Sequence, residues 1–155
     1  MSPSRYVFVI SVAVLGACWA LARPGAPSDD REDAYSAALR FAVNGLVEER
    51  ATVCVAIDLG AGATDPSLAV LENLPSGATR GSDCLAEAGR VTDRRTGKPA
   101  FLLTAVAVQW VSKNEGHVDV TQASTPERAA RRTYRVAREA GTWTALGPVM
   151  KDGPL

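Results

Sequence analysis

The longest mostly apolar run outside the N-terminus is Phe101–Ser112, with the sequence FLLTAVAVQWVS. It is rich in β-branched and aromatic residues, and glycine-containing turn sequences flank it on both sides. Such a bounded run is typical of a central strand in a sheet. Its even-numbered positions are bulkier, so we expect them to face a core covered by a helix. We expect the odd-numbered side, with Ala105, Ala107 and Gln109, to be open to a partner.

The first 22 residues resemble an export signal of the bacterial lipoprotein type. Tyr6–Ala17 is a run of 12 apolar or small residues, and it leads into a lipobox-like sequence in which Cys18 would receive lipid. Ala20–Ala22 instead resembles an A-x-A site for ordinary signal peptidase. An uncleaved anchor is the third alternative, since residues 6–22 just reach the length needed to span a bilayer. All three alternatives predict export, with residues 23–28 as a linker.

Three cysteines are present, and their number supports export. If Cys18 is lipidated or removed, Cys54 and Cys84 remain in an oxidising compartment, where two lone thiols are expected to pair. We therefore predict a Cys54–Cys84 disulfide, which would stabilise the fold by roughly 3 kcal/mol. The alternative is two buried cysteines that do not pair.

After the linker, we predict a single domain over residues 29–147. Ser28 followed by four carboxylates predicts the start of an amphipathic helix, which ends near Gly45. Thr52–Leu59 alternates as a half-buried strand does. Asp65 and Pro66 predict the start of a short helix.

We expect residues 75–90 to form a loop and Arg90–Thr92 to pair with the central strand. His117–Thr121 predicts the return strand. Thr125–Glu127 has the composition of a helix start, and residues 128–132 would add a helical turn to it. Residues 133–139 fit a strand better than a helix. The Ala140-Gly141 turn then leads into a last strand ending at Leu146, followed by an irregular tail over residues 148–155.

This order of elements resembles the cystatin-like and NTF2-like α+β folds, in which a curved antiparallel sheet wraps an N-terminal helix. The resemblance covers roughly residues 30–146 and rests on element order and on the hairpin from Tyr134 to Trp143. It implies a sheet of about four to five antiparallel strands. It also implies a pocket between helix and sheet, in which Asp58, Tyr35 or Tyr134 would serve as acid or base.

Several chemistries find no support in the motifs. The only histidine, His117, and two cysteines 30 residues apart do not have the spacing of metal ligands. No Gly-x-Ser-x-Gly elbow occurs. Two glycine-containing turns, Gly60–Asp65 and Thr96–Pro99, lack residues that a phosphate site requires. We therefore predict no metal, no cofactor and no catalytic residue.

Charge is unevenly distributed along a chain of zero net charge. Residues 29–93 hold 12 acidic and 5 basic residues, a balance of −7, whereas residues 94–138 hold 3 acidic and 9 basic residues, a balance of +6. Five arginines fall within eleven residues: Arg128, Arg131, Arg132, Arg135 and Arg138. They predict a patch for an anionic surface or envelope protein. The alternative is that they pair with the acidic first helix or stay solvated. An exported chain of zero net charge does not favour nucleic acid.

Together these features predict an exported α+β protein at the periplasm or the outer face of a bacterial membrane. The preferred function is that of a non-enzymatic binding or structural module. The alternative is an NTF2-like small-ligand binder or enzyme. A third is a subunit or inhibitor that docks a partner through its hairpins.

Overall fold

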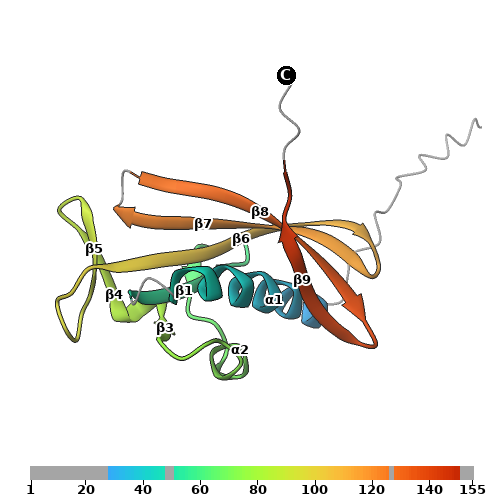
Figure 1. Cartoon of the computed structure of the whole chain (residues 1–155), viewed down its shortest axis with the longest axis horizontal. Coiled ribbons are helices and arrows are strands. Elements are labelled where there is room, and N and C mark those ends of the chain that lie inside the picture. Colours follow the sequence, from blue (N-terminus) through green and yellow to red (C-terminus); the bar gives the residue numbers. More distant parts are fainter. Residues whose placement is uncertain (1–27, 48–50, 126–127, 151–155) are drawn as a thin grey trace, which may run out of the picture.

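The computed structural model describes residues 28–47, 51–125 and 128–150. The predicted signal over residues 1–22, the lipidation site Cys18 and the linker up to residue 27 lie outside the described residues. The same holds for Pro126 and Glu127 of the predicted helix start and for the end of the predicted tail. The described chain is α+β: one long helix lies against a large, mostly antiparallel sheet (Figure 1).

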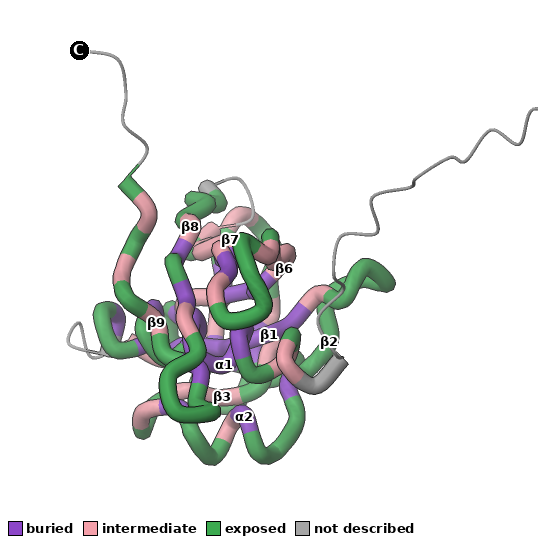
Figure 2. The backbone as a smooth tube through the Cα atoms, turned by 90° about the vertical axis from the view of Figure 1, so that its right-hand side faces the viewer, coloured by how far each residue is buried: buried purple, intermediate pink, exposed green. Residues whose placement is uncertain are grey.

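The long helix α1, Ser28–Val47, forms where the acidic start and the apolar spacing predict it. Its buried side chains recur every three or four residues and pack against the sheet; they include Ala34, Tyr35, Ala38, Leu39, Ala42, Val43 and Leu46. The helix runs two residues beyond Gly45, at which we expected it to end. The buried part of the chain therefore gathers between α1 and the strands around it (Figure 2).

The main sheet has seven strands, in the order β2-β1-β6-β7-β8-β9, with β3 also paired to β1. The predicted number of strands, four to five, was therefore too low. The strands are β1 (Thr52–Asp58), β2 (Ala63–Thr64), β3 (Ala78–Arg80), β6 (Ala100–Ser112), β7 (Glu115–Thr125), β8 (Arg128–Glu139) and β9 (Thr142–Pro148).

Strand β1 runs parallel to both β3 and β6, so the sheet is mixed. A connection of 41 residues, Leu59–Pro99, joins β1 to β6. It returns the chain to the end of the sheet at which β1 begins, so β6 runs in the same direction as β1. The five central residues of β1, Val53–Ile57, are all buried, because α1 covers one face and a second small core covers the other. The expectation of a half-buried strand was wrong for this reason.

The second core lies on the face of the sheet opposite α1 and contains the disulfide. Cys54 and Cys84 are bonded, with a sulfur–sulfur distance of 1.98 Å, and both are buried, which confirms the predicted pairing. They pack with Val91, Ala100 and Leu102. Cys84 begins β4 (Cys84–Glu87), so the bridge attaches a separate two-stranded sheet of β4 and β5 (Arg90–Asp93) to β1.

The segment predicted as a loop, residues 75–90, instead contains β3, the 3-10 helix η1 (Gly81–Asp83) and β4. Strand β5 pairs with β4. It contacts the segment before β6 through the bridge between Thr92 and Pro99 and through the hydrogen bond from the Asp93 amide to the Lys98 carbonyl. The short helix α2, Leu68–Glu72, is capped by the Ser67 hydroxyl and not by Asp65. The Asp65 carboxylate instead accepts hydrogen bonds from the amide and hydroxyl groups of Ser82, at 2.9 and 2.6 Å.

The central strand β6 contains a β-bulge between Ala105 and Ala107, opposite β7. Before the bulge, odd-numbered Leu103 and Ala105 belong to the core beneath α1, and after it even-numbered Val108 and Trp110 pack there. The extra residue moves side chains from one face to the other. The expectation that all even positions face the helix therefore holds only for the second half of the strand.

Residues 128–132 are strand and not a helical turn, because β8 begins at Arg128 and pairs with β7 from Arg128 to Ala137. The strand predicted over residues 133–139 is confirmed as the rest of β8. Ala140 and Gly141 both have positive φ, 49° and 85°, as a tight two-residue hairpin requires. Strand β9 then continues through Pro148, beyond its predicted end.

Candidate functional site

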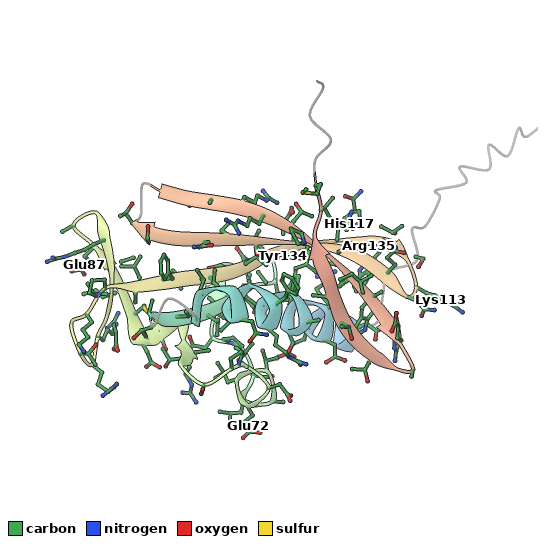
Figure 3. All side chains as sticks on the ribbon, viewed as in Figure 1. Glu72, Glu87, Lys113, His117, Tyr134 and Arg135 are labelled. Carbon is green, nitrogen blue, oxygen red and sulfur yellow. A yellow bond between two sulfur atoms is a disulfide. The ribbon has the colours of Figure 1, made fainter. Side chains whose placement is uncertain are left out.

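Strand β8 divides its arginines between the two faces of the sheet. Arg131 and Arg135 lie on the outer face, whereas Arg138 reaches α1 on the inner face. In Figure 3, Tyr134 lies between the strands and α1, and His117 and Arg135 lie on the other side of the sheet. The side chain of Arg128 lies outside the described part of the chain. The five arginines therefore do not share one face.

The outer-face arginines are each paired with a carboxylate of β7. Arg131 binds Asp119, which also accepts a hydrogen bond from the Thr133 hydroxyl. Arg135 Nε donates to Glu115 Oε1 at 2.6 Å. This hydrogen bond and the Arg135 charge lower the pKa of Glu115, and the same contact raises the pKa of Arg135. Cross-strand register places these opposite charges side by side, so this face is locally neutral.

His117 lies in this outer layer, between Gln109 of β6 and Arg135 of β8 in the strand register. It borders an open hollow of about 770 Å³ that Gln109, Asp119, Thr133 and Val149 also line, together with Arg131, Arg132 and Pro148. The hollow is broad and its described charges are largely paired. The odd-numbered side of β6 reaches it through Gln109 alone.

On the inner face, Arg138 ties the end of β8 to the start of α1. Its Nη1 lies 3.2 Å from Asp30 Oδ1, and the Trp143 indole N–H donates to the same oxygen at 3.4 Å. Asp30 stands in the first turn of α1, where a carboxylate complements the helix dipole. This contact is an instance of the predicted pairing between the arginines and the acidic helix.

A seam between α1 and the edge strand β9 has a different character. Phe41 of α1 is 42% exposed, although it packs on the buried ring of Tyr134 with ring centroids 5.7 Å apart. Phe41 borders two hollows, one on each side of it. The first, of about 180 Å³, is lined by Ala37, Arg40, Phe41, Asn44, Trp143, Thr144 and Ala145. The second, of about 210 Å³, is lined by Phe41, Ala42, Gly45, Leu46, Gln122, Arg132, Tyr134 and Pro148.

Each of these hollows has one arginine among its described lining residues and no described carboxylate. Arg40 and Arg132 are both exposed, and within residues 28–47, 51–125 and 128–150 neither forms an ion pair. We call the surface formed by Arg40, Phe41, Arg132 and β9 the α1–β9 seam. It combines an exposed aromatic ring with two cationic groups.

The acid and base candidates of the NTF2-like alternative lie on three different elements, although the charge of Asp58 acts on the Tyr35 hydroxyl. Tyr35 is buried under the sheet, and that burial raises the pKa of its hydroxyl. Asp58 stands at the end of β1. Its Oδ1 accepts hydrogen bonds from the backbone amides of Gly60 and Gly62, at 2.7 and 3.2 Å, and these bonds stabilise a turn. Tyr134 lies on β8 against Phe41. Among the described residues, no three His, Cys, Asp or Glu side chains are arranged as metal ligands.

Comparison with known proteins gives no family. No family model matches the chain, and neither a curated protein nor a solved structure shows significant similarity to it. Within the described segments, no helix has both the length and the apolar character required to cross a membrane.

The seam was missed from the sequence. Phe41 lies at the margin of the apolar stripe of α1, where it points to the side, next to β9. Arg40 drew no attention as a lone charge on a helix. The packing of α1 against both β8 and β9 places Arg40, Phe41 and Arg132 on one surface.

Proposed function

We propose that this chain is an exported protein of the bacterial envelope that acts as a non-enzymatic binding module, and that it holds an acidic partner protein on the α1–β9 seam. The observation that carries the proposal is the exposed Phe41 ring between two hollows that contain Arg40 and Arg132. Exposed aromatic rings and arginines are the residues that most often dominate binding energy at protein interfaces.

Charge supports an acidic partner over a neutral one. The outer-face arginines are already neutralised by Asp119 and Glu115, so they offer little to an anion. The seam arginines have no such partner among the residues that the structure describes. A carboxylate-bearing surface would gain charge-assisted hydrogen bonds here without displacing an existing pair.

The test uses a photo-crosslinking amino acid at position 41 of the full-length chain, expressed in its own host. We expect an envelope protein to crosslink from position 41 and the adduct to disappear when Arg40→Glu and Arg132→Glu are added. Leu68 of α2, which is 62% exposed, provides the matched control position. Equal crosslinking from positions 41 and 68, or no adduct at either, would contradict the proposal.

Export and lipid attachment remain predictions from residues 1–22 and form part of this proposal. Labelling of cells with a fatty-acid analogue should mark the wild-type chain and leave Cys18→Ala unlabelled. Labelling that persists in Cys18→Ala would rule out the lipid anchor. If the wild-type chain is unlabelled and has lost its first 22 residues, the A-x-A site is the processing signal.

The second candidate is a small-ligand binder of the cystatin-like or NTF2-like kind. It is favoured by the hollow beside Gln122, Arg132 and Tyr134, at the end of α1. Against it, Tyr35 and Leu39 fill the space between helix and sheet with buried side chains. Native mass spectrometry of the chain purified from its host would reveal a retained small molecule, and a chain free of ligand would count against this candidate.

A further inference from the structure

Strand β9 lies at one end of the main sheet, and the part of its free edge from Thr142 to Ala145 carries no charged side chain. On the opposite side, β2 and β3 are only two and three residues long. The first residues of β8, on the N-terminal side of Thr133, are not paired with β9. This exposed edge of β8 carries Arg131 and Arg132. Short strands and charged side chains are the usual means of protecting a sheet edge from pairing. The stretch Thr142–Ala145 has neither.

The backbone of this stretch has hydrogen-bonding groups that point away from the sheet. In a two-residue hairpin the residues that flank the turn, Glu139 and Thr142, form the hydrogen-bonded pair, and the pattern alternates from there. The amide and carbonyl groups of Thr142 and Thr144 therefore face β8, and those of Trp143 and Ala145 face outward. Beyond Ala145 the bulge at Leu146 and the ring of Pro148 end the regular edge.

One stripe of α1 runs along this edge. Ala37, Arg40, Phe41 and Asn44 recur at three- and four-residue spacing, and they line a hollow whose other wall is Trp143–Ala145. A strand added to β9 would lie in the plane of the sheet, so every second side chain of that strand would point toward this stripe. Successive inward side chains would be about 6.8 Å apart.

We propose that the seam binds an extended acidic segment of a partner protein by strand addition to β9. The inward side chains of this segment would be a carboxylate, an apolar residue and a second carboxylate, in the order of Arg40, Phe41 and Arg132 along the seam. Main-chain hydrogen bonds to Trp143 and Ala145 supply affinity, and the inward side chains supply selectivity. This inference rests on the proposed function and names the mode of binding at the same surface.

The experiment measures fluorescence anisotropy of a labelled hexapeptide, Glu-Thr-Val-Thr-Glu-Thr, with blocked termini and the full-length chain in detergent. The peptide with lysines in place of its glutamates is the charge control. We expect the acidic peptide to bind and the lysine peptide to bind at least ~10-fold more weakly, since two charge-assisted contacts are lost. Equal binding of the two peptides would overturn the assignment of an acidic segment.

Strand addition is tested by N-methylation, which removes a backbone donor. Methyl groups on the glutamates and valine block one edge of the peptide, and methyl groups on the threonines block the other. We expect one of these isomers to bind at least ~10-fold more weakly than the other, because only one edge contacts β9. If both isomers bind like the parent peptide, the strand mode is overturned, and a persisting crosslink at position 41 would show that the seam still binds a partner.

A protein variant gives an independent measurement. Ala145→Pro removes an outward amide that β8 does not use, so the fold should be retained, as edge strands tolerate proline there. We expect this variant to bind the acidic peptide ~10-fold more weakly and to keep the thermal unfolding midpoint of the wild type. Thr144→Pro is the contrasting variant, since it removes an inward hydrogen bond and should lower the thermal midpoint. Unchanged peptide binding by a folded Ala145→Pro chain would contradict the proposal.

An anionic membrane is the competing occupant of the same arginines. The full-length chain is therefore also mixed with phosphatidylglycerol vesicles in a flotation assay. Flotation that Arg40→Glu and Arg132→Glu abolish, together with no binding of the acidic peptide, would overturn the proposal in favour of a lipid surface. Peptide binding that these two variants abolish, with flotation unchanged, supports it.

Discussion

Phe41 of α1 and Tyr134 of β8 pack with their ring centroids 5.7 Å apart and their planes tilted by 56°. Tyr134 is buried, with 6% of its surface exposed, and it holds Phe41 against the sheet while 42% of Phe41 remains exposed. A tilted aromatic pair of this kind is stable without full burial. The exposed ring is therefore a fixed part of the surface, available to a partner beside Arg40 and Arg132.

Gly116 allows Trp110 to pack closely over β7. A Cβ atom at position 116 would lie 3.1 Å from Trp110 Cε3, so Gly116→Ala should displace the indole and lower the free energy of unfolding by about 1–3 kcal/mol. Gly45→Ala in α1 is the matched control, because nothing lies within 4 Å of its Cβ. It should raise the same quantity by about 0.5 kcal/mol. Urea unfolding measures both, and equal effects would contradict this packing.

The disulfide between Cys54 and Cys84 fixes the β4–β5 hairpin to β1. We expect the double variant Cys54→Ala, Cys84→Ala to lose about 3 kcal/mol of unfolding free energy, since the unfolded chain is no longer constrained by a loop of 30 residues. Urea unfolding of the variant and the wild type gives this difference. A thiol assay on the denatured, unreduced wild type is the control, and free thiols at Cys54 and Cys84 would disprove the bridge.

Asp30 joins α1 to both β8 and β9, through Arg138 and Trp143. Because the pair is partly exposed, Arg138→Gln should cost only about 0.5–1 kcal/mol of unfolding free energy. Asp30→Asn should in addition change the fluorescence of Trp143. A double-mutant cycle over Asp30 and Arg138 measures their coupling energy, and a value of zero would show that the pair contributes nothing to stability.

The pH dependence of stability should reflect Asp93. This carboxylate is 5% exposed and accepts the Thr96 hydroxyl at 2.9 Å and the Arg95 amide at 2.8 Å, and these hydrogen bonds lower its pKa. A lowered folded-state pKa stabilises the fold above the unfolded value of about 3.9, and this stabilisation is lost as the pH falls through the folded-state pKa.

The urea midpoint of Asp93→Asn should therefore lie below that of the wild type at pH 7, and the two should converge in strong acid. Glu72→Gln, at an exposed position of α2, is the control and should show no comparable gap at pH 7. A gap for Asp93→Asn that stays constant down to pH 2 would mean that the ionised carboxylate is not the stabilising form.

The helix and the strands of high local periodicity were predictable from the sequence, because each is determined by side chains near in sequence. Phe101–Ser112 is such a segment, and its strand assignment is confirmed. The bulge at Val106 was not predictable, because a one-residue irregularity depends on pairing with β7. The parallel direction of β1 likewise depends on a crossover whose strands are only two to four residues long.

The candidate site was less predictable than the fold. The run of arginines from Arg128 to Arg138 drew attention as a cluster, yet strand geometry sends neighbouring residues to opposite faces. Cross-strand register then pairs Arg131 and Arg135 with carboxylates that are 12 and 20 residues away in sequence. Arg40 and Arg132 share the seam because α1 packs against both β8 and β9.

Amide hydrogen exchange of Trp143 and Ala145 in the presence of the acidic hexapeptide tests the central claim most directly. In the free chain, we expect their outward amides to exchange faster than those of Thr142 and Thr144, which face β8. Saturating peptide should slow exchange at Trp143 and Ala145 and leave Thr142 and Thr144 unchanged. If exchange at Trp143 and Ala145 stays fast while the peptide is bound, no strand has been added to β9.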